Sequence, residues 1–325
     1  MANPIIGAVI IGRNEGKRLK QCLETVFRDI PNVVYVDSGS TDDSLAVARA
    51  TGAMTVELDL SQPFTAARAR NTGFKALTDR ITVDYVQFID GDCALAEGWV
   101  EAARAVLDAT SDCVVVCGRR RERFPEISIY NRLCDWEWDT PVGEARACGG
   151  DALVRAAAFA KVGGFNPDLI AGEEPELCVR LRGSGGRVFR IDHEMTLHDA
   201  AMTRFGQWWT RSRRAGHAYA EGAALHGKPP ERHGVAETRR ALLWGAALLI
   251  VILVLMLVVS PWMALLALIY PAQVLRLALR WGAGRRQSWE RAFFLTLGKF
   301  PEVQGVLEFY LRRILGRRRR LIEYK

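Results

Sequence analysis

Residues 241–259 form a run of 19 residues without a charged side chain. As a helix, this run is about 28 Å long, close to the roughly 30 Å thickness of a bilayer's hydrocarbon core. Ser260 and Pro261 then break the pattern, and residues 262–275 are again uncharged. The chain must therefore either bury a helical hairpin in protein or insert it into a membrane, and the length of the first run favours the membrane.

Positive charge surrounds this hairpin. The flanking residues are Arg239, Arg240, Arg276, Arg280, Arg285 and Arg286. Cytoplasmic loops carry an excess of Lys and Arg, so both ends of the hairpin are expected in the cytoplasm. The net charge of +7 comes from residues 239–325, since the rest of the chain is slightly acidic. A basic, apolar tail favours anionic lipids as partners, and no zinc-finger or RNA-recognition signature supports nucleic acid.

An amphipathic helix is predicted after the hairpin. Its apolar face consists of Val303, Val306, Leu307, Tyr310, Leu311, Ile314 and Leu315. Together with the basic run Arg317–Arg320, this face suits a membrane surface. Packing on the soluble part of the chain is the alternative.

The first half of the chain alternates β-rich runs with helical patterns, which predicts an α/β fold with a mostly parallel sheet covered on both faces. The expected strands are 5–11, 33–37, 53–58, 85–90 and 113–118. Helices are expected around Leu19–Val26, at Ser44–Ala50 and at Ala66–Leu77, a second α/β stretch at 151–199, and a linker at 227–234. We therefore expect a catalytic domain at 1–235, a membrane hairpin at 236–282 and a basic amphipathic tail at 283–325.

The seven cysteines indicate a reducing compartment. Their number is odd and no Cys-x-x-Cys occurs, which favours reduced, partly buried thiols in the cytoplasm. The short apolar run 5–11 has no basic residues before it, so we read it as a strand rather than a signal peptide.

Asp90-Gly91-Asp92 is the strongest single motif, because it directly follows the apolar run 86–89. Two carboxylates at a strand end can hold a hard divalent cation such as Mg²⁺ or Mn²⁺, and the glycine leaves room for a pyrophosphate. Such an ion neutralises charge on a departing nucleoside diphosphate. A surface turn is the alternative reading of this motif.

Five segments in a fixed order resemble glycosyltransferase family 2, whose members have the GT-A fold. They are Val9–Glu15, Val36–Asp42, Ala69–Gly73, Phe88–Asp92 and Ala171–Leu177. The resemblance covers about residues 5–220. It implies a Rossmann-like mixed sheet and a nucleotide-sugar donor, with a UDP-sugar as the expectation for the family.

The resemblance also implies roles for individual residues. Asp37 would recognise the base, with Ser38 in the same turn, and Asp92 would be the principal metal ligand. The other implied donor-binding residues are Arg13, Asn14 and Glu15 near base and ribose, Arg70 near the phosphates, and Asp90 and Gly91 near the ribose. For the turn at Asp37, the alternative is a helix N-cap, which is compatible with binding.

Glu173 and Glu174 are the candidates for the general base. Many members of the family carry Glu-Asp here, so Glu174 reaches one methylene further than the usual Asp. An inverting transfer needs a base close to the acceptor hydroxyl, and we expect Glu174 in this role, with Glu173 second. The alternative is an acidic first turn of a helix, which Pro175 also suits.

Further residues are expected near the acceptor or the diphosphate. Gly149, Gly150 and Asp151 resemble the small-residue turn beside the acceptor, and His198 aligns with a histidine that can touch the metal or diphosphate. Trp208, Arg211 and Arg214 combine an aromatic ring with cations that could bind a diphosphate or lipid phosphate. The Gln-x-x-Arg-Trp motif of processive synthases is degenerate, because Ala215 stands where its Trp would be.

The sequence thus predicts an inverting, metal-dependent glycosyltransferase at the bacterial inner membrane, with its catalytic domain in the cytoplasm. The expected acceptor is a polyprenyl-linked glycan, in exopolysaccharide or cell-surface glycan assembly. A polyprenyl monophosphate or simple membrane lipid is the nearest alternative acceptor. A non-catalytic, nucleotide-binding membrane scaffold is the alternative of a different class.

Overall fold

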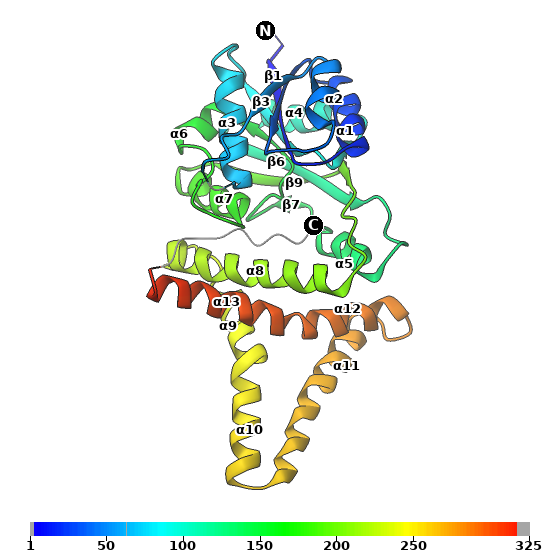
Figure 1. The fold of residues 1–325 in the computed structure, drawn as a ribbon, viewed down its shortest axis with the longest axis vertical. Helices are drawn as coiled ribbons and strands as arrows, with labels where there is room; N and C mark the ends of the chain where they lie inside the picture. The colour runs from blue at the N-terminus through cyan, green and yellow to red at the C-terminus, as the bar shows by residue number, and fades with distance from the viewer. Residues whose placement is uncertain (1–2, 63, 317–325) are drawn as a thin grey trace. The chain divides into compact units, whose positions relative to one another are not determined.

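The computed structural model describes residues 3–62 and 64–316, so the predicted basic run Arg317–Arg320 lies outside the described residues. By their internal contacts, the residues form two units that divide between Ala201 and Met202 (Figure 1). Each unit is described by itself.

A single mixed sheet organises the first unit. Within the described ranges it has nine strands in the order β3-β2-β1-β4-β8-β6-β9-β5, with β7 on β9. The strands are β1 (Ile6–Gly12), β2 (Asn32–Asp37), β3 (Met54–Glu57), β4 (Tyr85–Asp90), β5 (Cys93–Leu95), β6 (Cys113–Glu122), β7 (Gly143–Glu144), β8 (Ala152–Arg155) and β9 (Arg187–His198).

All five predicted strands are present, and β1 to β4 are parallel as expected. The second half of the sheet differs, because β8 inserts antiparallel between β4 and β6. Strand β6 runs on to Glu122, four residues beyond the predicted end, and pairs parallel with β9. The sheet is therefore mixed, which is the arrangement that the family resemblance implied.

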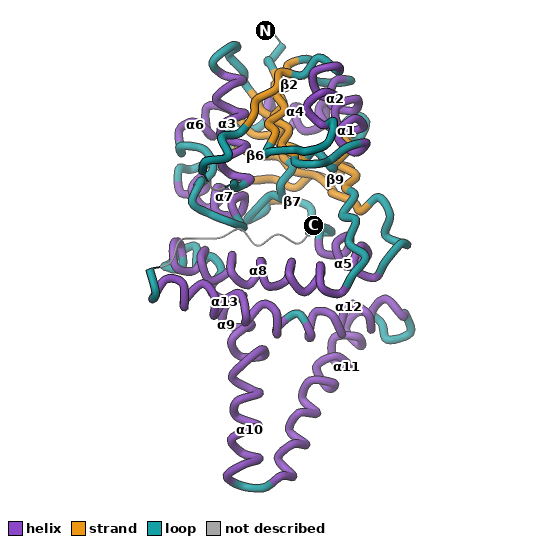
Figure 2. Tube along the Cα trace, viewed as in Figure 1, coloured by secondary structure: helices purple, strands orange, loops and turns teal. Residues whose placement is uncertain are grey.

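Helices lie on both sides of these strands (Figure 2). They are α1 (Lys17–Phe27), α2 (Ser44–Ala50), α3 (Ala66–Thr78), α4 (Trp99–Ala109), α5 (Ile129–Glu137), α6 (Ala156–Lys161) and α7 (Glu173–Gly183). The helices predicted around Leu19–Val26, at Ser44–Ala50 and at Ala66–Leu77 are confirmed, whereas α5 was not predicted. Its start is fixed by Ser128, whose hydroxyl accepts a hydrogen bond from the backbone of Asn131.

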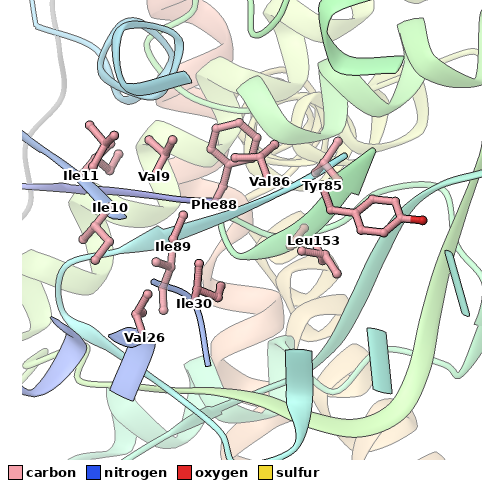
Figure 3. Packing of buried hydrophobic residues seen from close by; sticks show 14 of the residues in the cluster. Val9, Ile10, Ile11, Val26, Ile30, Tyr85, Val86, Phe88, Ile89 and Leu153 are labelled. Carbon is pink, nitrogen blue, oxygen red and sulfur yellow. The ribbon is translucent and has the colours of Figure 1, made fainter. Parts of the chain in front are cut away.

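The core forms where the two central strands, β1 and β4, face the helices. Side chains alternate across a strand, so Ile10 and Ile89 lie on the same side of the sheet as Val26 of α1, and Phe88 lies on the other (Figure 3). All four are almost completely buried. Because both faces are covered, these strands read as continuous apolar runs, which is why the sequence located them.

The second unit is helical. Its elements are α8 (Phe205–His226), α9 (Val235–Leu242), the π-helical turn η1 (Leu243–Ala247), α10 (Leu248–Val258), the 3₁₀ helix η2 (Pro261–Leu268), α11 (Ile269–Trp281), α12 (Arg286–Leu297) and α13 (Lys299–Ile314). The predicted linker at 227–234 separates α8 from α9. Helix α8 packs on α13 and so belongs to the same unit as the helices that follow it. The predicted domain boundaries 1–235, 236–282 and 283–325 stay a prediction.

Two continuous helical stretches are long and apolar enough to cross a membrane, judged by length and composition. They are Val235–Val258, with 24 residues, and Pro261–Trp281, with 21, and few of their residues are buried. Leu257, Val258 and Trp262, around the turn between them, are strongly exposed. An apolar hairpin that protein does not cover is the arrangement expected of a membrane anchor rather than of a buried core.

Helices α8 and α13 approach each other closely enough for their backbones to touch. A Cβ atom on Gly216 of α8 would lie 1.9 Å from the carbonyl oxygen of Glu302, and one on Gly305 of α13 would lie 1.9 Å from that of Arg213. Only glycine fits at these two positions.

This contact divides the apolar face that was predicted for α13. Val303 and Val306 are buried, whereas Leu307, Leu311 and Ile314 are exposed. The helix was predicted correctly, but only Val303 and Val306 of the seven predicted apolar residues are covered, and the other five stay available to another apolar surface.

The glycine contact gives a stability prediction. We expect Gly216→Ala to cost about 1–3 kcal/mol of folding free energy, because the added methyl meets a backbone carbonyl that cannot rotate away. That cost should lower the thermal midpoint of the detergent-purified protein by about 2–4 °C per kcal/mol. Gly206→Ala is the matched control on the same helix, since nothing lies within 4 Å of the added atom. Equal midpoints for the two variants would refute the close contact.

Candidate functional site

The turn after β2 holds Asp37 through a dense set of hydrogen bonds. One carboxylate oxygen accepts from the backbone N–H groups of Gly39 and Ser40 at 2.9 and 2.8 Å. The other accepts from the hydroxyls of Tyr35 and Ser40 at 3.0 and 2.5 Å. A nucleotide base would have to replace one of these partners. Ser38 in the same turn is buried, and its hydroxyl has no hydrogen-bond partner among the described residues.

The first loop, after β1, lies against this turn. The backbone N–H of Asn14 donates to the hydroxyl of Ser40 at 2.9 Å, and its side-chain oxygen accepts from the N–H of Thr41 at 2.7 Å. Asn14 has a φ of 57°, which Asn tolerates better than most residues. Arg13 is exposed, and Glu15 forms an ion pair with Arg18 at 2.8 Å. The structure thus brings the predicted base-binding residues together at one edge of the sheet.

Arg70 is the centre of the buried charge cluster. Its guanidinium contacts Asp90 at 2.7 Å, Glu174 at 2.9 Å and Glu173 at 3.1 Å. These residues come from three elements: α3, the end of β4 and the first turn of α7. The side chain of Arg70 is only 2% exposed, so its charge is buried and needs these carboxylates as partners.

The carboxyls of this cluster differ in acidity. Burial raises the pKa of Glu174, and the neighbouring charge of Glu173 raises it further, to about 7, against the opposing effect of Arg70. Burial acts on Asp90 in the same direction, but Arg70 and Arg120 outweigh it and hold the pKa of Asp90 below its usual value. A carboxyl with a pKa near 7 can exchange a proton at neutral pH, whereas Asp90 stays ionised.

Gly150 completes the wall of this cluster. A Cβ atom at this position would lie 2.9 Å from both Arg70 Nη2 and Asp90 Oδ2, and 3.2 Å from Glu174 Oε1. The backbone therefore passes directly over the charged groups, which a side chain would prevent. Asp151 is fully buried and accepts a hydrogen bond from the backbone N–H of Asp90 at 3.1 Å, whereas Gly149 is exposed and has no atom near its Cβ position. Gly150 and Asp151 of the predicted turn therefore reach the cluster, and Gly149 does not.

Asp92 and His198 lie side by side, as a metal site requires. His198 Nε2 is 3.4 Å from Asp92 Oδ2, and its Nδ1 is 3.6 Å from Glu122 Oε2. Ligand atoms of Asp92, Cys93 and His198 lie within 4.8 Å of one another, as do those of Asp90, Cys93 and Asp151. Carboxylate oxygens with one imidazole fit Mn²⁺ or Mg²⁺.

Arg120 and Trp138 belong to the site but were not predicted. Arg120 pairs with Asp90 at 3.2 Å and with Asp151 at 3.4 Å, and its guanidinium stacks 5.0 Å from the ring of Trp138. Trp138 also packs edge-on against His198. The sequence offered only a weak signal for Arg120: it lies two residues before Glu122 on one strand, which places both side chains on the same face.

Trp208, Arg211 and Arg214 lie on α8, in the second unit. Trp208 is buried, and its ring packs edge-on against Phe294 of α12 at 5.0 Å. The neighbouring Trp209 donates a hydrogen bond to Gln304 of α13 at 2.9 Å. These rings stabilise the helical unit, and the acceptor role of the three residues stays a prediction.

Comparison with known proteins supports the family resemblance. The model of the family described as "Glycosyl transferase family 2" matches residues 8–159, just under half of the chain. The pre-mycofactocin glycosyltransferase of Mycobacterium tuberculosis is 29% identical over 171 residues, which are 49% of this chain and 35% of that protein. Glycosyltransferase AglE of Haloferax volcanii is 26% identical over 195 residues, 56% of this chain and 62% of that one. The chain thus spans less than two thirds of either relative.

A solved structure resembles almost the whole chain. It is the mannosyltransferase PcManGT of Pyrobaculum calidifontis in complex with GDP-Man and Mn²⁺, with a TM-score of 0.66 and 17% identity over 95% of this chain and 88% of that one. At this identity the likeness establishes the fold, a GT-A sheet followed by C-terminal helices. Residues 8–159 are therefore a glycosyltransferase family 2 domain, within a chain that has the GT-A fold.

Proposed function

We propose that this protein is an inverting, metal-dependent glycosyltransferase. In this proposal it transfers a sugar from a nucleotide-sugar to a lipid-linked acceptor at the cytoplasmic face of a bacterial inner membrane, during the assembly of a cell-surface glycan. One observation carries the proposal: Arg70 gathers Asp90, Glu173 and Glu174 from distant parts of the chain into one buried cluster.

Glu174 is the proposed general base. Inversion is a single displacement, so the base must take the proton of the acceptor hydroxyl on the face of the sugar opposite the leaving diphosphate. A pKa of about 7 suits this task, because the carboxylate is largely available at neutral pH yet basic enough to accept a proton. Arg70 fixes the carboxylate at 2.9 Å and so orients it before the acceptor arrives.

Asp92 and His198, with Asp90 nearby, are the residues that would hold a divalent cation. Such a cation would neutralise the charge that develops on the departing nucleoside diphosphate. The first loop and the Asp37 turn form the proposed site for the base and ribose. GDP-Man is bound by the mannosyltransferase with a similar fold, and a UDP-sugar stays our expectation from the family.

The proposed lipid-linked acceptor rests on the apolar hairpin. Two adjacent helical stretches that are long enough to cross a bilayer would keep the enzyme at the membrane, where such acceptors are found. Arginines on both flanks favour a cytoplasmic location for both ends. Two spans are too few to form a channel for a polymer, so we propose the addition of a single sugar.

The direct test is release of nucleoside diphosphate by membranes that contain the purified protein. UDP- and GDP-sugars are offered with Mn²⁺ or Mg²⁺, with and without a bacterial lipid extract. We expect metal-dependent release that the lipid stimulates, and product analysis then separates polyprenyl diphosphate, polyprenyl monophosphate and simple lipid acceptors. Nucleotide binding without release from any donor would instead support a scaffold.

The pKa of Glu174 predicts the pH dependence. Since the base acts in its deprotonated form, kcat/KM should rise with pH, with an apparent pKa of about 7, and level off above it. Glu173→Gln removes the like charge beside Glu174, so this apparent pKa should fall by about one unit. A rise in the apparent pKa of this variant, or a pH profile that it leaves unchanged, would contradict the assignment.

A further inference from the structure

Two cysteine sulfurs lie in contact beside the carboxylate cluster. The Sγ atoms of Cys148 and Cys178 are 3.5 Å apart. Cys148 lies in the segment between β7 and β8, and Cys178 lies in α7. A disulfide bond is about 2.05 Å long, so the two sulfurs would need to approach by only about 1.5 Å to be joined.

We propose that Cys148 and Cys178 are a redox-sensitive pair that forms a reversible disulfide with a peroxide. One sulfur, as thiolate, attacks a peroxide oxygen and becomes a sulfenic acid, while the oxygen that leaves takes up a proton to give water. The thiol of the other cysteine then attacks this sulfur, and the sulfenic oxygen leaves as a second water. The peroxide is reduced, and each sulfur is oxidised by one electron.

The exposure of Cys148 favours this pair. Cys148 is half-buried, whereas the other six cysteines are buried, so a dissolved oxidant reaches the pair from the side of Cys148. The adjacent Gly149 is exposed, and no atom lies within 4 Å of a Cβ atom built on it, so this side of the pair is open. The hydrogen bond between the two thiols raises the pKa of Cys148 well above its usual value, and burial adds to this rise, whereas the same bond lowers the pKa of Cys178. Cys178 is therefore the cysteine that supplies the thiolate, and Cys148 is the thiol that completes the bond.

The pair is placed to affect the site. Cys178 lies one helical turn after Glu174, and Cys148 lies two residues before Gly150, where an added Cβ atom would lie 2.9 Å from Asp90 and 3.2 Å from Glu174. A disulfide would pull the Gly150 segment against the helix that carries Glu174. We expect this shift to lower turnover at least tenfold. This expectation rests on the proposed function, whereas the formation of the disulfide does not depend on it.

The test uses the full-length, detergent-purified protein. It is treated with hydrogen peroxide, free thiols are alkylated, and peptides are mapped by mass spectrometry. We expect a peptide pair joined through Cys148 and Cys178 that dithiothreitol separates. Cys178→Ser should abolish this link, whereas Cys134→Ser, a buried cysteine in α5, should retain it. Oxidation of Cys148 to sulfinic or sulfonic acid without the link, or links only between other cysteines, would overturn the proposal.

Activity is measured on the same samples. Nucleoside-diphosphate release by the wild type should fall after peroxide and recover after dithiothreitol, and release by Cys178→Ser should not respond to peroxide. A disulfide without any change in release would refute the effect on the site. A disulfide in a protein that shows no transfer in either state would refute the proposed function and leave the redox pair standing.

Discussion

Glu174→Gln is expected to lower the turnover of sugar transfer by about 10²–10⁴-fold, the usual contribution of a general base. The amide has the size of the carboxylate but cannot take the acceptor's proton. It can still accept the hydrogen bond from Arg70, so the cluster should remain folded. Donor binding, measured by calorimetry with the nucleoside diphosphate and Mn²⁺, should change little, because the loss concerns a step after binding.

Two variants sharpen this prediction. Glu101→Gln changes an exposed carboxylate in the first turn of α4 and should leave turnover unchanged. Glu173→Gln should retain most of the turnover at high pH. If Glu173→Gln were the more damaging of the two cluster variants, Glu173 rather than Glu174 would be the base.

Asp92→Asn is expected to remove most of the metal dependence together with the activity. Losing one anionic ligand should weaken Mn²⁺ binding by at least about tenfold and lower turnover by about 10³-fold, equivalent to roughly 4 kcal/mol of barrier. Electron paramagnetic resonance measures free Mn²⁺ directly, and raised Mn²⁺ should restore part of the rate.

The matched control is Asp112→Asn. Asp112 is half-exposed and pairs with Arg187 far along the sheet from the metal-ligating candidates, so both Mn²⁺ binding and turnover should stay as in the wild type. Normal Mn²⁺ binding by Asp92→Asn would show that Asp92 is not a ligand, whatever happened to the rate.

The sequence predicted which polar residues of the first four strands come together, because these strands are parallel. Buried parallel strands are continuous apolar runs, and polar residues that follow them meet at one edge of the sheet. This logic located Asp37 after β2 and Asp90 after β4. The sequence did not reveal that the Asp37 carboxylate already accepts hydrogen bonds from Gly39 and Ser40 in its own turn and from Tyr35, two residues earlier on the same strand.

Arg120 was missed for a physical reason. Arg120 lies on β6, which pairs with β9 across register shifts on either side of Arg119. A register shift changes which face of the sheet a side chain points to. Alternation along the strand therefore does not tell which of Arg119, Arg120 and Arg121 faces Asp90. Only the pairing of residues far apart in the chain decides it.

The apolar hairpin was the easiest element to predict and α13 the hardest to interpret. Length and absence of charge are local properties, and both apolar stretches appear where they were expected. The partner of an amphipathic helix is not a local property. Gly216 and Gly305 gave no signal in the sequence, although their contact decides which apolar residues of α13 are covered.

The touching backbones of α8 and α13 also impose an order on synthesis. Helix α8 precedes the apolar hairpin and α13 follows it. Both apolar stretches must therefore be synthesised before α13 is present to pack against α8. Until Lys299–Ile314 has emerged, the glycine-containing face of α8 has no helix to receive it. The packing of α8 on α13 therefore forms only late in synthesis. A chain cut before Lys299 would leave the glycine-containing face of α8 uncovered and open to the cell's quality-control proteases.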